Sequence, residues 1–145
     1  MRVQLALNVP NLDDAVEFYS KLFCAEPHKR RPGYANFSLD APPLKLVLFE
    51  NPDASERLNH LGVEVFDAPQ LSAAAARLNA AGIAEESEQG VTCCHATQDK
   101  VWASEPGGLR WEWYRITDDA PKKEAALAPT TTCCAGLSAP SCCAD

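Results

Sequence analysis

The sequence has no long apolar run and no excess of basic residues. No apolar stretch in its 145 residues approaches the roughly 20 consecutive residues that are needed to span a bilayer. With 13 Lys and Arg against 20 Asp and Glu, the net charge is −7, which argues against partners such as nucleic acid or an anionic membrane surface. Residues 1–14 are too soon interrupted by polar residues to be a signal peptide. We therefore expect a cytoplasmic protein with no nucleic-acid or membrane partner.

The cysteines do not resemble a disulfide framework. There are seven, an odd number, and six of them form adjacent pairs: Cys93–Cys94, Cys133–Cys134 and Cys142–Cys143. In a reducing cytoplasm such thiols stay free. Adjacent thiols join no distant parts of a fold, but they can chelate a soft, thiophilic element.

Alternating and helical periodicities predict a repeated β-α-β-β-β unit. The segment 4–9 aligns with 60–65, and 43–49 aligns with 108–114. We predict helices over about 11–24 and from Asp67 to Gly82, and strands at 2–9, within 30–39, and at 44–50, 61–66, 83–88, 91–104 and 109–116. The expected fold class is α+β: two modules, about 1–52 and 57–116, forming a curved mixed sheet. Composition changes near Thr117, so we predict a domain at 1–116 and a flexible tail at 117–145.

Strand alternation places three polar side chains on the uncovered face of this sheet. Leu5, Leu7 and Val9 should face the first helix, which leaves Gln4 on the opposite face. By the same parity, His60 and Glu112 face away from the second helix. A histidine, a carboxylate and an amide in one concavity form a donor set for a first-row metal. Against this, a single strand histidine is more often an ordinary polar residue than a ligand.

These features together resemble the vicinal oxygen chelate superfamily, which includes glyoxalase I, fosfomycin resistance proteins and extradiol dioxygenases. The resemblance implies a metal cup built from two βαβββ modules, with Gln4, His60 and Glu112 at the ligand positions. It implies that His60 and Glu112 are catalytic. Val47 occupies the position of the fourth ligand of glyoxalase I. Because valine cannot bind a metal, coordination positions of the metal would stay open. The expected metal is Fe(II), although Gln4 in place of a histidine leaves Mn, Ni or Co open.

Residues 2–116 further resemble organoarsenical C–As lyases, which are iron-dependent dioxygenases, and the related cadmium-induced proteins. The resemblance rests on Cys93-Cys94 with the run 96–102, and on the segments 32–37 and 42–48. It implies an enzyme of arsenical detoxification whose substrate is a small trivalent organoarsenical, such as a methyl- or aryl-arsenite. Dioxygen would be the co-substrate, and inorganic arsenite the product. The two thiols would hold the arsenic beside the metal.

Geometry constrains this interpretation, because adjacent residues on a regular strand point to opposite faces. A loop or bulge at 90–92 would let Cys93 and Cys94 both turn inward. The alternative is a pair of buried, small apolar residues. His95 would favour the thiolate as a neighbouring base, or it is an ordinary polar residue.

Other residues have weaker assignments. Four aromatic residues are expected to surround the organic group, unless they belong to the core: Tyr34, Phe37, Trp102 and Tyr114. The tail cysteines are either accessory metalloid-binding sites or of no consequence: Cys133, Cys134, Cys142 and Cys143.

Two other functions remain open. One is a binding protein for arsenic or cadmium that performs no chemistry. The other is a different superfamily enzyme, such as a thiol transferase or isomerase that uses a divalent metal. The resemblance also leaves open whether the modules pair within one chain or across a homodimer.

Overall fold

The computed structural model describes residues 1–93 and 95–119. Their elements follow in the order β1 (Arg2–Val9), α1 (Leu12–Phe23), β2 (Lys29–Arg31), β3 (Tyr34–Leu39), β4 (Leu44–Glu50), β5 (Leu58–Glu64), α2 (Ala68–Ala80), β6 (Glu86–Cys93), β7 (Ala96–Ser104) and β8 (Arg110–Asp118). This is β-α-β-β-β twice over, so the predicted repeat is confirmed. In the described part of the chain, neither helix is long and apolar enough to cross a membrane.

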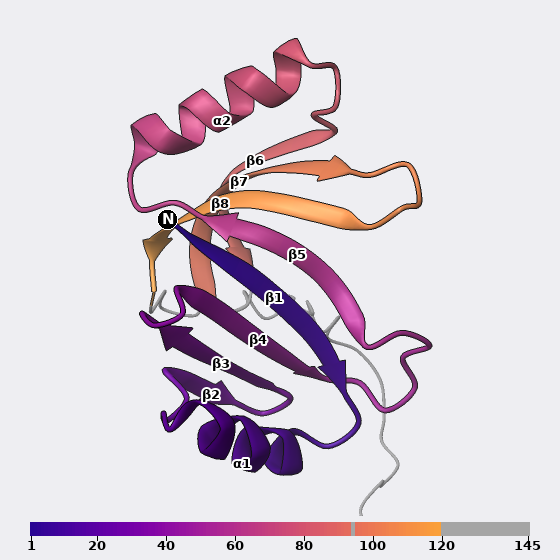
Figure 1. Ribbon diagram of the computed structural model, residues 1–145. Helices are drawn as coiled ribbons and strands as arrows, with labels where there is room; N and C mark the ends of the chain where they lie inside the picture. Colours follow the sequence, from indigo (N-terminus) through magenta and orange to yellow (C-terminus); the bar gives the residue numbers. More distant parts are fainter. Residues whose placement is uncertain (94, 120–145) are drawn as a thin grey trace, which may run out of the picture.

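All eight of these strands form one mixed sheet with the order β2-β3-β4-β1-β5-β8-β7-β6. The two modules meet at its centre, where β1 and β5 pair antiparallel. Within each module the first and last strands pair in parallel, β1 with β4 and β5 with β8. The sheet curls, with α1 outside the first module and α2 outside the second (Figure 1). The predicted α+β fold with a curved mixed sheet is confirmed.

Both helices begin where the sequence predicts. The side chain of Asn11 accepts a hydrogen bond from the Asp14 amide at 3.1 Å, and Asp67 accepts from the Gln70 amide at 2.8 Å. Each cap satisfies an amide that the first helical turn leaves without a partner. The caps therefore fix the point at which the chain leaves β1 and β5.

The two faces of the sheet differ in chemistry. Between the first module and α1 lies an apolar core of buried residues: Val9, Leu12, Val16, Ala35, Phe37, Leu39, Leu46 and Leu48. The concave face instead buries polar side chains. Of the ten buried polar or charged residues in the described ranges, seven line one pocket: Gln4, Lys29, Asn36, Lys45, His60, Gln98 and Glu112. Buried polar groups need partners, so this pocket is the place to look for function.

The predicted bulge next to Gly90 is confirmed, but the predicted strand bounds of 83–88 and 91–104 were wrong, because Gly90 does not end a strand. β6 runs through it to Cys93, with a register shift between Glu88 and Val91. Gly90 has a positive φ of 62°, and its amide donates to Asp99 Oδ1 on β7 at 2.9 Å. The cross-strand carboxylate thus keeps the glycine in the sheet as a bulge.

Two predicted strand boundaries were wrong. β5 begins at Leu58 and ends at Glu64, rather than spanning 61–66. β8 continues to Asp118, two residues beyond the predicted end of the domain, because Thr97 on β7 pairs with Asp118 and accepts a hydrogen bond from the Thr117 hydroxyl at 3.1 Å. The predicted tail beyond residue 119 lies outside the described residues.

Candidate metal and substrate site

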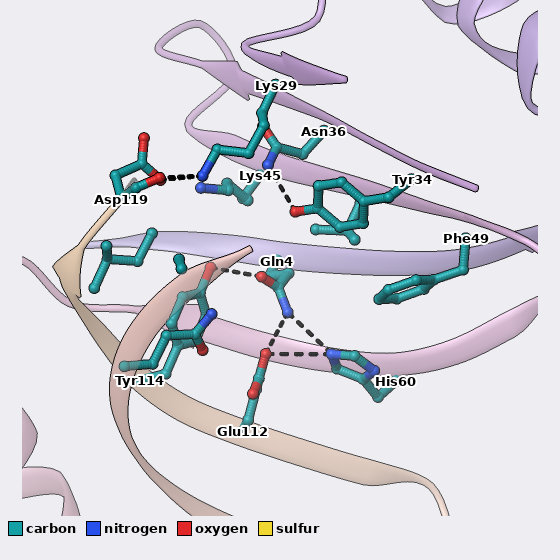
Figure 2. A pocket seen from close by; sticks show the side chains of 14 residues that line it. Gln4, Lys29, Tyr34, Asn36, Lys45, Phe49, His60, Glu112, Tyr114 and Asp119 are labelled. Carbon is teal, nitrogen blue, oxygen red and sulfur yellow. Dashed lines mark hydrogen bonds and ion pairs between the residues drawn. The ribbon is translucent and has the colours of Figure 1, made fainter. Parts of the chain in front are cut away.

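Three neighbouring strands bring the predicted metal ligands together. Gln4 lies on β1, His60 on β5 and Glu112 on β8, the three strands at the centre of the sheet. Gly62 of β5 is the register partner of both Gln4 and Glu112. Their side chains point toward one another in the pocket (Figure 2).

The three polar groups are in mutual contact. Gln4 Nε2 donates to Glu112 Oε1 at 2.5 Å and lies 3.1 Å from His60 Nε2. His60 Nε2 is 3.2 Å from Glu112 Oε1. All three residues are buried, none exposing more than 9% of its surface. An amide, an imidazole and a carboxylate therefore meet at one point inside the pocket.

A chain of amides orients the His60 ring. His60 Nδ1 lies 2.7 Å from Asn59 Oδ1, which can only accept, so Nδ1 carries a proton. Asn59 in turn donates to Asn8 Oδ1 at 2.9 Å, and Asn8 donates to the Glu56 carbonyl at 3.0 Å. In the neutral ring, Nε2 then presents its lone pair to the pocket. Such an arrangement is typical of a metal-binding histidine, and sequence reasoning did not identify Asn59 as its partner.

Glu112 is anionic in its buried position. Lys100 Nζ donates to Glu112 Oε2 at 3.1 Å, opposite the oxygen that faces His60. Burial alone would raise the pKa of Glu112, but its polar contacts with His60 and Lys100 outweigh it and hold the pKa below its ordinary value. The carboxylate is thus available to a cation without first losing a proton.

Tyr114 fixes the orientation of the Gln4 amide. Its hydroxyl donates to Gln4 Oε1 at 2.5 Å. Burial, reinforced by the charges of Glu64 and Glu112, raises the pKa of Tyr114 well above its ordinary value, so the phenol keeps its proton. The amide nitrogen, rather than the oxygen, consequently faces His60 and Glu112.

These contacts fit a cation site. The lone pair of His60 and the charge of Glu112 converge on the amide hydrogens of Gln4, which carry partial positive charge. A divalent metal would replace those hydrogens, and Gln4 would turn its oxygen inward to join the donor set. Tyr114 would keep a hydrogen bond in that orientation, because a phenol can also accept. Val47 lines the pocket at the expected fourth position and contributes no donor.

Cys93 lies at the end of β6, beside the same pocket. Its register partner on β7 is Ala96, which lines the pocket. Directly opposed residues of antiparallel strands project to the same face, so Cys93 belongs to the concave side. Cys93 is half-buried. Cys94, like the tail cysteines 133, 134, 142 and 143, lies outside the described residues.

His95 packs against the opposite end of the sheet rather than toward the metal ligands. Its ring lies edge-on to Tyr34 of β3, with centroids 5.2 Å apart. Its backbone has a positive φ of 62°, and its carbonyl accepts a hydrogen bond from Lys29 Nζ at 2.9 Å. The turn after Cys93 thus contacts the first module.

Aromatic side chains form one wall of the site, but the predicted set was partly wrong. Tyr34 and Tyr114 line the pocket, and Trp102 lies edge-on to His60 with centroids 5.5 Å apart. Phe37 instead packs in the core beneath α1, because it is an odd number of residues from Tyr34 and faces the other side of β3. Phe49, which was not predicted, takes its place in the pocket.

A second group of polar residues lining the pocket was also missed. It consists of Lys29, Asn36, Lys45 and Gln98, each at most 8% exposed. The signal was present in the alternation: on β3, Asn36 shares parity with Tyr34, and on β4, Lys45 shares parity with Val47. The sequence does not show which groups a lysine pairs with, so Lys29 and Lys45 look like solvent-exposed residues of their strands.

Comparison with known proteins agrees with this geometry. Residues 2–113 match the model of the Glyoxalase/Bleomycin resistance protein/Dioxygenase superfamily. The chain is 60% identical over 119 residues to the cadmium-induced protein CadI of Mycobacterium bovis, covering 82% of this chain and 78% of that protein. It is 52% identical over 134 residues to a trivalent organoarsenical cleaving enzyme of Thermomonospora curvata, covering 92% and 87% respectively.

Among solved structures, the Mn(II)-bound glyoxalase from Novosphingobium aromaticivorans has a TM-score of 0.60 at 20% identity. The match covers 85% of this chain and 41% of that one, and shows a shared fold. Fold, site geometry and sequence similarity agree: the chain belongs to the glyoxalase/bleomycin resistance protein/dioxygenase superfamily.

Proposed function

We propose that this protein is a metal-dependent enzyme that cleaves the carbon–arsenic bond of trivalent organoarsenicals and releases inorganic arsenite. The observation that carries the proposal is the meeting of Gln4, His60 and Glu112 in a pocket that Cys93 borders. The similarity to the Thermomonospora curvata enzyme, over nearly the whole chain, supports the substrate class.

In this proposal, Gln4, His60 and Glu112 would hold Fe(II), and the same donor set would accept Mn, Ni or Co. When bound, Fe(II) would supply the activation of dioxygen. The protein prepares the site before the metal arrives, since Asn59 fixes the histidine tautomer and Lys100 helps keep Glu112 ionised. His60 and Glu112 are therefore the residues whose loss should stop the reaction.

The substrate would be held through sulfur. Cys93 and Cys94 would each displace one hydroxyl from arsenic, forming two arsenic–sulfur bonds and releasing two waters. Holding arsenic beside the metal makes the later step intramolecular and oriented. Tyr34, Phe49, Trp102 and Tyr114 would surround the organic group and exclude water from it.

The overall reaction balances for the simplest substrate. One methylarsenite and one dioxygen contain the atoms of one arsenous acid and one formaldehyde. Arsenic stays trivalent, the methyl carbon loses four electrons, and dioxygen takes up four. No external reductant is needed for this substrate.

A second candidate is a protein that binds arsenic or cadmium through its thiols without chemistry. The 60% identity to a cadmium-induced protein favours it. Under this candidate, binding would survive the loss of His60 or Glu112, and no product would form.

The test is to load the reduced protein anaerobically with Fe(II), add methylarsenite, and then admit oxygen. We expect oxygen-dependent arsenite and formaldehyde in equal amounts, quantified by chromatography with arsenic detection and by a formaldehyde assay. His60→Ala, Glu112→Gln and Cys93→Ser should each abolish both products. Wild-type protein that binds the arsenical but releases no arsenite after oxygen is admitted would exclude the enzyme and favour the binding protein.

A further inference from the structure

Lys29 joins three segments of the chain that are distant in sequence. It lies on β2, and its ammonium donates to the backbone carbonyl of His95 at 2.9 Å. It also donates to the carbonyl of Asp119 and, at 2.9 Å, to Asp119 Oδ1 (Figure 2). We call this arrangement of Lys29, Asp119 and the His95 carbonyl the Lys29 junction. It connects β2 at one end of the sheet, the turn between β6 and β7 at the other, and the residue that follows β8.

The junction is saturated with hydrogen bonds. Lys29 is only 8% exposed, and a buried ammonium is costly unless it is paired. Its three donors have three acceptors, and the second carboxylate oxygen of Asp119 lies 3.0 Å from His28 Nε2. Burial alone would raise the pKa of Asp119, but the hydrogen bonds from Lys29 and His28 outweigh it and hold the pKa below its ordinary value. The carboxylate that orients Lys29 is thus ionised at neutral pH.

The junction acts on the turn that carries the thiols. The carbonyl of Cys93 accepts a hydrogen bond from Gln98 Nε2 at 3.1 Å, and the carbonyl of His95 accepts from Lys29. Both carbonyls flanking position 94 are therefore held by buried side chains that line the pocket. Gln98 lies on the neighbouring strand β7 and moves with the hairpin. Lys29 comes from the other module, so it sets where the hairpin end sits over the pocket.

We propose that Lys29 is a positioning residue for arsenic capture: by holding the His95 carbonyl, it fixes the cysteine-bearing turn against the pocket. The inference rests on the proposed function, in which the thiols grip arsenic. Lys29 touches neither arsenic nor metal in this arrangement. Its loss should weaken capture by the thiols and leave the metal ligands intact, because Gln4, His60 and Glu112 lie on the three central strands.

The test compares three substitutions in the full-length, reduced, metal-free protein. Lys29→Met removes the donors and keeps most of the side-chain volume. Asp119→Asn keeps Lys29 but replaces its carboxylate partner. Arg30→Met is the matched control, since Arg30 follows Lys29 on β2, is exposed, pairs with Asp13 and does not line this pocket.

Each protein also carries Cys133→Ser, Cys134→Ser, Cys142→Ser and Cys143→Ser, so that the tail thiols do not contribute. Arsenical capture is measured by tryptophan fluorescence during titration with phenylarsine oxide, with Cys93→Ser as the blank. We expect Lys29→Met to weaken capture about tenfold, as for the loss of a hydrogen bond from a charged donor. Asp119→Asn should weaken it by a smaller factor, and Arg30→Met should stay within about twofold of wild type. Metal affinity, measured by anaerobic Co(II) titration, should stay within about twofold of wild type for Lys29→Met.

A folded Lys29→Met protein with wild-type capture would overturn the inference. So would an equal loss of capture and metal affinity, because that would indicate general disruption. If Lys29→Met does not fold, Asp119→Asn decides the question by the same two measurements. A wild-type protein without thiol-dependent capture would instead refute the proposed function, so the two failures are distinguishable.

Discussion

Replacing Gly62 with alanine should damage the metal site more than the fold. Gly62 lies on β5, between the strands that carry Gln4 and Glu112, and it is the register partner of both residues. A Cβ at this position would lie 2.9 Å from Glu112 Cγ, 3.2 Å from the Glu112 carbonyl oxygen and 3.3 Å from Gln4 Cβ. The added methyl group would thus be wedged between two of the three proposed ligands.

The size of the effect follows from these distances. Carbon atoms in contact lie about 3.5–4.0 Å apart, so the Glu112 side chain must move by roughly 0.6 Å or more. A functional site tolerates displacements of only about 0.5 Å. Overpacking costs about 1–3 kcal/mol, and alanine in a strand recovers about 0.5–1 kcal/mol of backbone entropy relative to glycine. We therefore expect the free energy of unfolding to fall by about 1–2 kcal/mol, and metal affinity to fall by about 10–100-fold.

The repeat provides a matched control. Ala6 occupies the equivalent position on β1, where its parallel partner is Val47 rather than Glu112. Ala6→Gly should cost a similar amount of stability, about 1 kcal/mol, with metal affinity within about twofold of wild type. Urea unfolding gives the stability, and anaerobic Co(II) titration gives the affinity. If Gly62→Ala keeps wild-type metal affinity, then Gln4 and Glu112 do not bind one metal together and the proposed site is wrong.

Three further predictions concern the thiols, the bulge and the tail. In a full-length protein carrying Cys133→Ser, Cys134→Ser, Cys142→Ser and Cys143→Ser, the further change Cys93→Ser should abolish capture of phenylarsine oxide in a fluorescence titration, whereas Cys24→Ser, at an exposed thiol, should not change it; capture by the Cys93 variant would contradict the dithiol. Asp99→Ala should lower the free energy of urea unfolding by about 1–2 kcal/mol at pH 7, because Asp99 accepts hydrogen bonds from the bulge amide and Arg115. The Arg115 hydrogen bond holds the pKa of Asp99 below its ordinary value, so this difference should be complete above about pH 4 and vanish as pH falls through the folded-state pKa. Removing residues 120–145 should lower the arsenic bound per chain, measured by mass spectrometry, without loss of arsenite release; unchanged stoichiometry would show that the tail thiols bind none.

Strand parity was enough to predict that three polar side chains share the concave face of the sheet. Gln4, His60 and Glu112 are far apart in sequence, but each lies on a strand whose apolar face could be identified from alternation. Once a helix covers that face, the other residues must point into the concavity. The sequence left open whether the two modules pair within one chain, and the antiparallel pairing of β1 with β5 in the structure brings the three side chains together.

Where parity was not applied, prediction failed. Tyr34 and Phe37 were assigned to one wall although an odd separation on a strand sends them to opposite faces. Phe37 accordingly packs beneath α1, and Phe49 lies near Tyr34 with ring centroids 5.7 Å apart. The aromatic side chain of Phe37 suggested a place in the pocket wall, but its position on β3 directs it into the core.

Closure of the curved sheet could not be predicted from local pattern. Lys29 begins the run Lys29-Arg30-Arg31, which looks like a solvated basic segment, and Arg30 and Arg31 are indeed exposed. Lys29 alone is buried, because the turn after β6 and the end of β8 bring acceptors to it. Its burial depends on contacts 66 and 90 residues away along the chain.

The orientation of Gln4 shows a different limit, and explains why an amide suits this position. The sequence predicted an oxygen ligand, yet the amide hydrogens face His60 and Glu112, because two groups with inward lone pairs need a positive partner when no cation is present. A carboxylate at position 4 would add a second negative charge beside Glu112. An amide can present hydrogens without metal and oxygen with it, while Tyr114 bonds to its other end in both orientations. Strand position and residue type predicted Gln4 as a ligand, but only its hydrogen-bond partners show that its amide hydrogens lie where a cation would lie.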